Sequence, residues 1–267
     1  MTAHLVTDAL WTIVQPLLPR TSRPKGGRPR TPDHAVLSGI MFILRYGLPW
    51  RALPRALGFG SGLTCWRCLR EWQAAGVWEH LHHAVLEHLH GADLLDWSRA
   101  SLDSISVPAP NGGEACGPCP TDRGKSGSKI HVVVDRAGTP LAVTVSGANV
   151  HDNRQLEATV DAVPPVRSGR PGRPRRRPSK LHADKAYDAR WCRRALRARR
   201  IQPRIARRGV ESTQGLGRHR WCVERSLSWL MGFKKLAVRQ ERCVEHYRGL
   251  CLLACAVIGL RRLAGRF

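Results

Sequence analysis

The segment ASLDSISV at residues 100–107 decides the fold, because apolar and polar side chains alternate along it. This period of two is typical of a strand with one buried face. Two more strand-like segments follow at residues 129–135 and 139–146, and Arg-Ala-Gly at 136–138 predicts a hairpin between them. The chain therefore begins a sheet at this segment.

Helices and strands alternate after the hairpin. The expected helices lie at residues 152–163, 189–199, 219–235 and 245–264. Short strands are expected at residues 181–184 and 201–206. Three strands followed by this alternation predict an α/β fold, with a mixed sheet covered by helices.

The first 95 residues have helical rather than strand-like patterns. Helices are expected after an N-cap at Thr7-Asp8 and at residues 33–45, 50–57, 63–74 and 77–90, with glycines between them. Such short helices fit a helix-turn-helix module and fit a plain helical bundle equally well. The predicted domains are therefore a helical one at 1–95 and an α/β one at 96–267. The second includes a Pro-rich basic loop at 167–180.

The charge of the chain indicates a polyanionic partner. Lys and Arg total 44 against 20 Asp and Glu, giving a net charge of +24, and only seven of the basic residues are Lys. Arg binds phosphate in a bidentate manner, so nucleic acid is the first candidate and an anionic membrane surface the weaker one.

The sequence also bears on location. The N-terminal residues lack a signal pattern, and the longest apolar stretch, at 249–260, is too short to span a bilayer. We expect a soluble, cytoplasmic protein without a membrane. The nine cysteines fit free thiols in a reducing compartment. The pairs Cys65/Cys68 and Cys116/Cys119 have zinc-like spacing, but neither lies in a zinc-site context.

Three acidic residues stand out in this basic chain. Asp103 lies inside the first strand, Asp184 ends the short strand LHAD, and Glu224 lies in the amphipathic segment WCVERSLSWL. Three such carboxylates can hold two Mg²⁺ or Mn²⁺ ions for phosphodiester chemistry. The alternative for each Asp is a cap or an ion pair, and for Glu224 it is an ion pair with Arg220 or Arg225.

Four other acids compete with these three. They are Asp122, Asp135, Asp152 and Asp188. We expect Asp135 to serve the hairpin turn and Asp188 to be the N-cap of the helix that follows it.

At these residues the sequence resembles the insertion-sequence-five family of bacterial DDE transposases. The segments that carry the resemblance are LPWRALP, REWQAAGVWEHL, LDSISV, PTDRGKSGSKIHVVVD, GTPLAVTVSGANVHD, LHADKAYD and RHRWCVERSLSWLMGFKKLAVR. The resemblance implies a ribonuclease-H-like catalytic core. It places Asp103 on the first strand, Asp184 just past the fourth, and Glu224 on a helix after the fifth.

The C-terminal signature of that family is only partly present. It consists of Tyr, two residues, Arg, three residues, Glu, six residues and Lys. Arg220 and Glu224 match it, whereas Gly217 and Met231 stand at the Tyr and Lys positions. Lys234 and Lys235 lie about one turn later and are candidates to replace that Lys. Arg220 is expected either to bind a DNA phosphate or to orient Glu224.

Further basic residues are expected to contact DNA. Arg28, Arg30, Arg173 and Arg175 lie in Arg-Pro segments that resemble minor-groove hooks, or else form solvated linkers with unspecific phosphate contacts. Arg123, Lys125 and Lys129, in the turn TDRGKSGSK, are expected to position substrate phosphates.

The sequence thus predicts a metal-dependent DNA transposase. It would cleave the ends of an insertion sequence and join the freed 3′-OH to target DNA. The expected partners are double-stranded DNA, both terminal inverted repeats and target, and further copies of the chain in a homodimer or larger synaptic complex. Two alternatives remain: a non-catalytic DNA-binding protein or repressor derived from a transposase, and a related nuclease acting on RNA–DNA hybrids or junctions.

Overall fold

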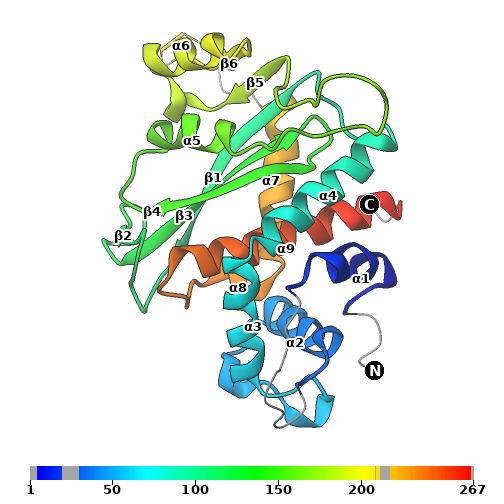
Figure 1. The fold of residues 1–267 in the computed structure, drawn as a ribbon. Coiled ribbons are helices and arrows are strands. Elements are labelled where there is room, and N and C mark those ends of the chain that lie inside the picture. The colour runs from blue at the N-terminus through cyan, green and yellow to red at the C-terminus, as the bar shows by residue number, and fades with distance from the viewer. Residues whose placement is uncertain (1–4, 20–29, 208, 211–216, 266–267) are drawn as a thin grey trace.

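The helical character of the N-terminal region is confirmed (Figure 1). The structure is a computed structural model that describes residues 5–19, 30–207, 209–210 and 217–265, the last range with backbone alone at 217–219. Thr7 caps the first helix as predicted, since its Oγ1 accepts a hydrogen bond from the backbone N–H of Leu10 at 3.2 Å. The elements are α1 (Asp8–Val14), η1 (Gln15–Leu17), α2 (Asp33–Tyr46), η2 (Trp50–Ala52), η3 (Arg55–Leu57), α3 (Gly62–Ala74) and α4 (Val77–Gly91).

The second region contains the mixed sheet. Its strands are β1 (Ala100–Pro108), β2 (Gly117–Pro118), β3 (Ser126–Asp135), β4 (Pro140–Gly147), β5 (Lys180–Ala183) and β6 (Gln202–Ile205). The helical elements are η4 (Asp152–Gln155), α5 (Leu156–Asp161), η5 (Lys185–Tyr187), α6 (Arg190–Ala198), α7 (Gly217–Met231), α8 (Lys234–Ala237) and α9 (Val244–Leu263). The short edge strand β2 was not predicted.

β1 lies in the middle of this sheet. It pairs antiparallel with β3 along its whole length, and β3 pairs antiparallel with β4 and β2. On its other side β1 runs parallel to β5, and β5 runs parallel to β6. An antiparallel hairpin joined through a central strand to parallel strands is the ribonuclease-H-like arrangement, so the predicted fold class is confirmed.

The hairpin turn depends on Asp135, as predicted. This buried carboxylate accepts hydrogen bonds at Oδ1 from the backbone N–H groups of Ala137 and Thr139, at 3.0 and 2.7 Å. Its Oδ2 accepts a third from the backbone N–H of Asp96 at 3.0 Å. Asp135 therefore has a structural role in joining β3 to β4.

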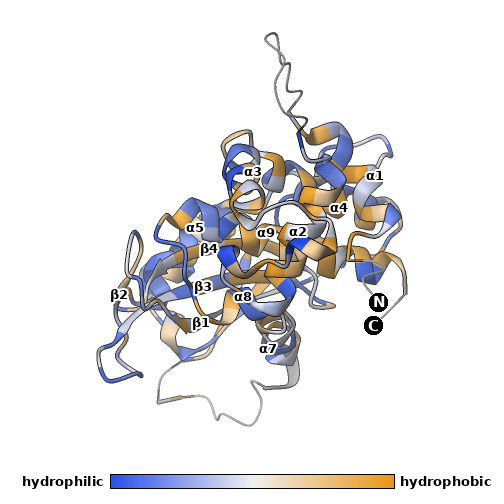
Figure 2. Cartoon of the chain, turned by 90° about the horizontal axis from the view of Figure 1, so that it is seen from below, coloured by the Kyte–Doolittle hydropathy of each residue, from blue (hydrophilic) through white to orange (hydrophobic). Residues whose placement is uncertain are grey.

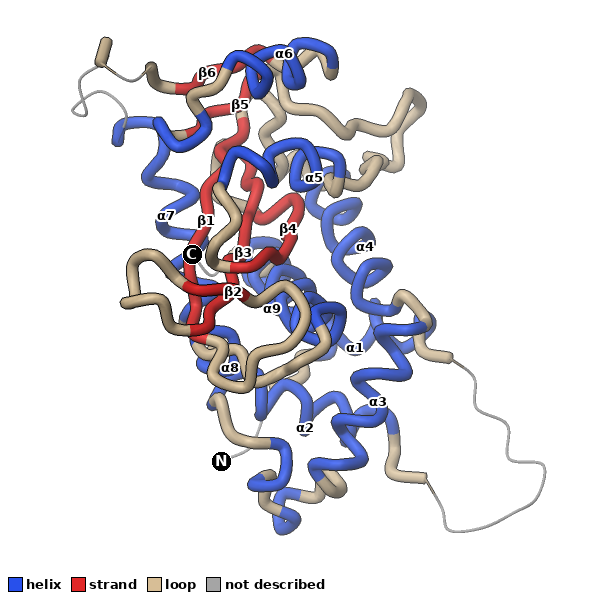
Figure 3. The backbone as a smooth tube through the Cα atoms, turned by 90° about the vertical axis from the view of Figure 1, so that its left-hand side faces the viewer, coloured by secondary structure: helices blue, strands red, loops and turns tan. Residues whose placement is uncertain are grey.

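Helices cover both sides of the sheet. α7 and α5 lie on opposite sides of β1 in two views of the molecule (Figures 1 and 3). α9 lies centrally, between the helices of the N-terminal region and strand β4 (Figure 2). Its apolar residues belong to one buried cluster that also includes side chains of α2, α3, α4 and the strands. The division at residue 95 remains a prediction, and so does the helix-turn-helix interpretation.

The predicted helix at 219–235 is interrupted. α7 ends at Met231, and the chain is extended at Phe233 before the short α8 begins. Phe233 is only 4% exposed, so its ring turns into the core instead of continuing along the helix surface. Burial of this aromatic side chain therefore overrides the helical pattern.

A second local prediction is also wrong. Asp188 does not cap α6, whose N-cap is Ala189 without a side-chain hydrogen bond. Asp188 instead forms an ion pair with Arg193 at 2.5 Å. This contact reaches from the preceding turn to the first turns of the helix, where a carboxylate also faces the positive end of the helix dipole.

No helix in the described part of the chain combines the length and the apolarity that a membrane span requires.

The contact between α4 and α9 depends on Gly259. A Cβ atom at this position would lie 2.6 Å from Cγ1 of Val85 and 3.2 Å from Cδ1 of Leu89. We expect Gly259→Ala to lower the free energy of unfolding by about 1–3 kcal/mol in chemical denaturation, because overpacking outweighs the gain in helix propensity. In a Val85→Ala background the same substitution should cost much less. An equal cost in both backgrounds would contradict this packing.

Candidate active site

The register of β1 and β5 brings two of the predicted acids together. Ser101 pairs with His182 in the parallel ladder, so Asp103 and Asp184, two residues further along each strand, lie at the same level and on the same side. Asp184 keeps an extended backbone beyond the end of β5. The negative charge of Asp184 raises the pKa of the Asp103 carboxyl. The register therefore directs Asp103 and Asp184 to the same region of the sheet, and their convergence on one metal site stays a prediction.

Asp103 is held by two donors. Nη2 of Arg220, on α7, donates to Oδ2 at 2.7 Å, and the backbone N–H of Ser104 donates to Oδ1 at 2.8 Å. Both side chains are largely buried, with 18% of Asp103 and 14% of Arg220 exposed. Burial raises the pKa of Asp103, the Arg220 guanidinium opposes that rise, and the carboxylate of Asp184 adds to it.

Asp184 is oriented by the turn that follows it. Its Oδ1 accepts a hydrogen bond from the backbone N–H of Ala186 at 2.9 Å, so the side chain caps η5. One carboxylate oxygen is thus engaged by the backbone, which fixes the direction of the group.

Two further residues belong to this cluster. Asp152, considered only as a rival acid, accepts hydrogen bonds at Oδ1 from Ser104 Oγ at 2.9 Å and from Lys129 Nζ at 3.0 Å. Tyr187 was not singled out at all. It is 1% exposed, and its hydroxyl lacks a hydrogen-bond partner among the described residues. Burial raises its pKa well above the ordinary value, and the charges of Asp152, Asp103 and Asp184 raise it further.

The Tyr187 hydroxyl is therefore a donor close to several carboxylates. Its position in LHADKAYD, three residues after Asp184, was the available signal.

Glu224 is placed differently from the two aspartates. It is exposed on α7, one turn after Arg220, and it forms no ion pair in the part of the chain that the structure describes. Arg220 pairs with Asp103, and Arg225 donates to the Ala137 carbonyl oxygen and stacks between Trp221 and Trp229. Within the described residues, no three His, Cys, Asp or Glu side chains are grouped closely enough to hold a metal ion.

Asp103 and Asp184 fit a divalent cation by their chemistry. They are two carboxylates on neighbouring segments, and the guanidinium of Arg220 balances the charge of Asp103. Glu224, from α7, and Asp152, from η4, are the acids available as a third ligand.

The family of the chain follows from comparison with known proteins. Residues 6–82 match the family model described as "Putative transposase of IS4/5 family", and residues 98–258 match the one described as "Transposase DDE domain". The chain belongs to the DDE transposases. The predicted resemblance is therefore confirmed.

Two curated relatives come from Burkholderia cepacia. The "Putative transposase for insertion sequence element IS402" is 48% identical over 142 residues, which cover 53% of this chain and 67% of that protein. The "Insertion element IS402 uncharacterized 16.2 kDa protein" is 48% identical over 123 residues, covering 45% of this chain and 84% of that protein.

Among solved structures, two assemblies of the Mos1 transposase are similar to this chain. The pre-cleavage Mos1 transpososome has a TM-score of 0.29 and 13% identity, covering 90% of this chain and 82% of that one. The Mos1 mariner paired end complex with Mn has a TM-score of 0.25 and 10% identity, covering 92% and 82%. Because both TM-scores are low, it is the strand order β2-β3-β1-β5-β6 that supports the fold.

The predicted DNA-contacting residues of this transposase divide by exposure. Arg123, Lys125, Arg173, Arg175 and Lys234 are exposed. Lys129 is 15% exposed and paired with Asp152. Arg28 lies outside the described residues, and Arg30 pairs with Asp33 at 3.3 Å and with Glu71 at 3.8 Å inside the helical region. For these residues DNA contact remains a prediction.

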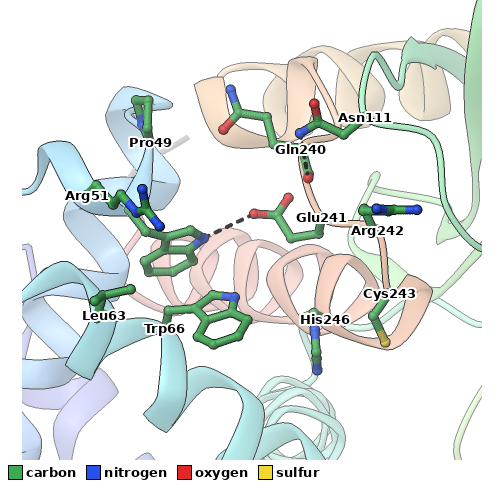
Figure 4. A pocket seen from close by; sticks show the side chains of 11 residues that line it. Pro49, Arg51, Leu63, Trp66, Asn111, Gln240, Glu241, Arg242, Cys243 and His246 are labelled. Atoms are coloured by element: carbon green, nitrogen blue, oxygen red, sulfur yellow. Dashed lines mark hydrogen bonds between the residues drawn. The ribbon is translucent and has the colours of Figure 1, made fainter.

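The prediction for Lys235 is wrong. It is 1% exposed, and its Nζ donates to Gln240 Oε1 at 2.6 Å and lies 3.3 Å from Glu241 Oε1. The same Glu241 oxygen accepts from Trp50 Nε1 at 3.3 Å, beside a cavity of about 650 Å³ (Figure 4). A buried, paired ammonium ties η2 to the segment after α8 and does not reach DNA.

The ion pair between Arg220 and Asp103 predicts a measurable shift. In Arg220→Gln we expect the pKa of Asp103 to rise further, because the neutral amide no longer favours the ionised carboxylate while burial and Asp184 still oppose it. Titration of ¹³C-labelled Asp carboxyl groups by NMR would measure this. Arg225→Gln is the matched control on the same helix. An unchanged or lower pKa in Arg220→Gln would contradict the role of the pair.

Proposed function

We propose that this transposase cuts DNA at the ends of an insertion sequence and joins the freed 3′-OH to target DNA. The observation that carries the proposal is the parallel register of β1 and β5 in a DDE transposase domain, which supports a site formed by Asp103 on β1 and Asp184 directly after β5. Asp103, Asp184 and Glu224 would hold two Mg²⁺ or Mn²⁺ ions, which supply activation of the attacking oxygen and stabilisation of the leaving oxygen.

The residues of the chain prepare this site in three ways. The backbone of Ala186 and the guanidinium of Arg220 fix the directions of Asp184 and Asp103. Arg220 also balances the charge of Asp103 until a cation binds Asp103 or a DNA phosphate binds Arg220. The buried Tyr187 hydroxyl can then donate a hydrogen bond to a carboxylate or to a phosphate oxygen at the site.

Double-stranded DNA is the proposed partner. The net charge of +24 supplies attraction to the phosphate backbone. The exposed residues Arg123, Lys125, Arg173, Arg175 and Lys234 are the proposed contacts. Arg28, which lies outside the described residues, Arg30 and Lys129 are proposed as further contacts. Pairing of two element ends requires at least a homodimer, which we propose by analogy with the family.

The alternative is a DNA-binding protein without catalysis, acting for example as a repressor. The ion pair of Asp103 with Arg220 favours it, since the guanidinium at 2.7 Å occupies one of the two oxygens of that carboxylate. A cleavage assay separates the two functions, because binding without metal-dependent cutting would support the repressor.

The central test is Asp184→Asn. We expect metal-dependent cleavage of DNA carrying the element ends to fall by about a hundredfold or more, since loss of a metal ligand removes several kcal/mol of transition-state stabilisation. DNA binding, measured by fluorescence anisotropy, should remain. Asp122→Asn, at a rival acid that pairs with Lys125, serves as the control. Undiminished cleavage by Asp184→Asn removes this residue from the site.

The third acid is tested by comparing Glu224→Gln with Asp152→Asn. We expect Glu224→Gln to weaken Mn²⁺ binding, measured by calorimetry, and to reduce cleavage as strongly as Asp184→Asn. Asp152→Asn should retain most of both, because Asp152 is engaged by Lys129 and Ser104. The reverse result would assign the third position to Asp152 and reject Glu224.

A further inference from the structure

A cavity of about 310 Å³ opens on the parallel half of the sheet, and basic side chains line it. They are Arg99, Lys180, His182 and Arg204. Among the described residues that line the cavity none is acidic, and none of the four was predicted to contact DNA. Three of them carry permanent positive charge, so the cavity is suited to an anion.

The strand register places this cavity on the same side of the sheet as the acids. Ser101 pairs with His182, and His182 pairs with Arg204 on β6. Because side chains alternate along a strand, Lys180, His182 and Asp184 lie on one side of β5. Arg99, Ser101 and Asp103 form the corresponding row along β1.

The distance from the cavity to the acids follows from the rise of the strand. His182 and Lys180 precede Asp184 by two and four residues, which corresponds to about 7–13 Å at a rise of about 3.3 Å per residue. α7 packs over β1 on this side, since Cys222 contacts Ser101. Arg204, on the outer strand β6, is exposed, so the cavity is reached from the β6 side.

We propose that this cavity binds a backbone phosphate of the cut DNA strand, one or two nucleotides from the scissile phosphate. The proposal rests on the proposed function. It adds a substrate track, by which we mean the row of basic side chains that binds the substrate strand next to the acids. Lys180 and Arg204 provide charge-assisted hydrogen bonds to the phosphate oxygens. The row of basic side chains leads along β5 to Asp184, so a strand that follows it arrives at the acid pair.

The test is the salt dependence of DNA binding by the double variant Lys180→Gln/Arg204→Gln of the full chain. Binding to an end-of-element DNA duplex is measured by anisotropy in EDTA, so that cleavage plays no part. We expect the slope of log Kd against log salt to become shallower by about 1, as for one lost phosphate contact, and Kd to rise about tenfold. The charge-conserving double variant Lys180→Arg/Arg204→Lys should bind the same duplex with nearly the wild-type Kd.

The matched control is Arg197→Gln, at an exposed residue of α6 outside the cavity. A slope and Kd for the double variant equal to those of Arg197→Gln would overturn the proposal. Duplexes in which a single phosphate near the cut site is replaced by a neutral methylphosphonate locate the contact. When the replaced phosphate is the one that the cavity binds, the double variant should bind this duplex as tightly as it binds the unmodified one. Additive losses of affinity at every replaced position would also overturn the proposal.

The outcome is independent of the cleavage assay. If the wild-type protein never cuts DNA, the proposed function fails while the binding measurement still stands. If the protein cuts DNA and the double variant binds normally, the substrate track fails and the function remains.

Discussion

The candidate site depends on holding two carboxylates of like charge side by side where water is partly excluded. Two such charges a few ångströms apart repel by on the order of a few kcal/mol. The sheet imposes the arrangement, since β1 and β5 run parallel with Asp103 and Asp184 at the same level. Arg220, which lies on α7, offsets part of this repulsion between the two carboxylates. The ion pair between Arg220 and Asp103 therefore helps to hold α7 against the central strand.

Much of the fold was predictable because the strands and helices carry clear periodicities. The alternation in residues 100–107, the hairpin around Gly138 and the helices of the N-terminal region all agree with the structure. The positions of Asp103 inside a strand and of Asp184 directly after one were predictable for the same reason, whereas their role as metal ligands stays a prediction. The long-range pairing of β1 with β5 was available only through the family resemblance.

The failures share a physical cause, which is side-chain contact that a periodic pattern does not contain. Phe233 ends a helix by turning into the core, Asp188 binds Arg193 instead of a helix end, and Lys235 is buried against Glu241. A sequence pattern records the local preference of each residue. It does not record which side chain becomes buried, or which charged partner it then binds.

The central position of β1 also determines when the site can form during synthesis. The ladder between β1 and β5 closes a chain segment from residue 101 to residue 182, and such distant pairing follows the local helices and the hairpin. Asp103 leaves the ribosome well before Asp184 and α7. A product that stops within the loop at 167–180 would thus contain the basic helical region without the paired acids. Synthesis through β5 is a precondition for assembling the acid pair.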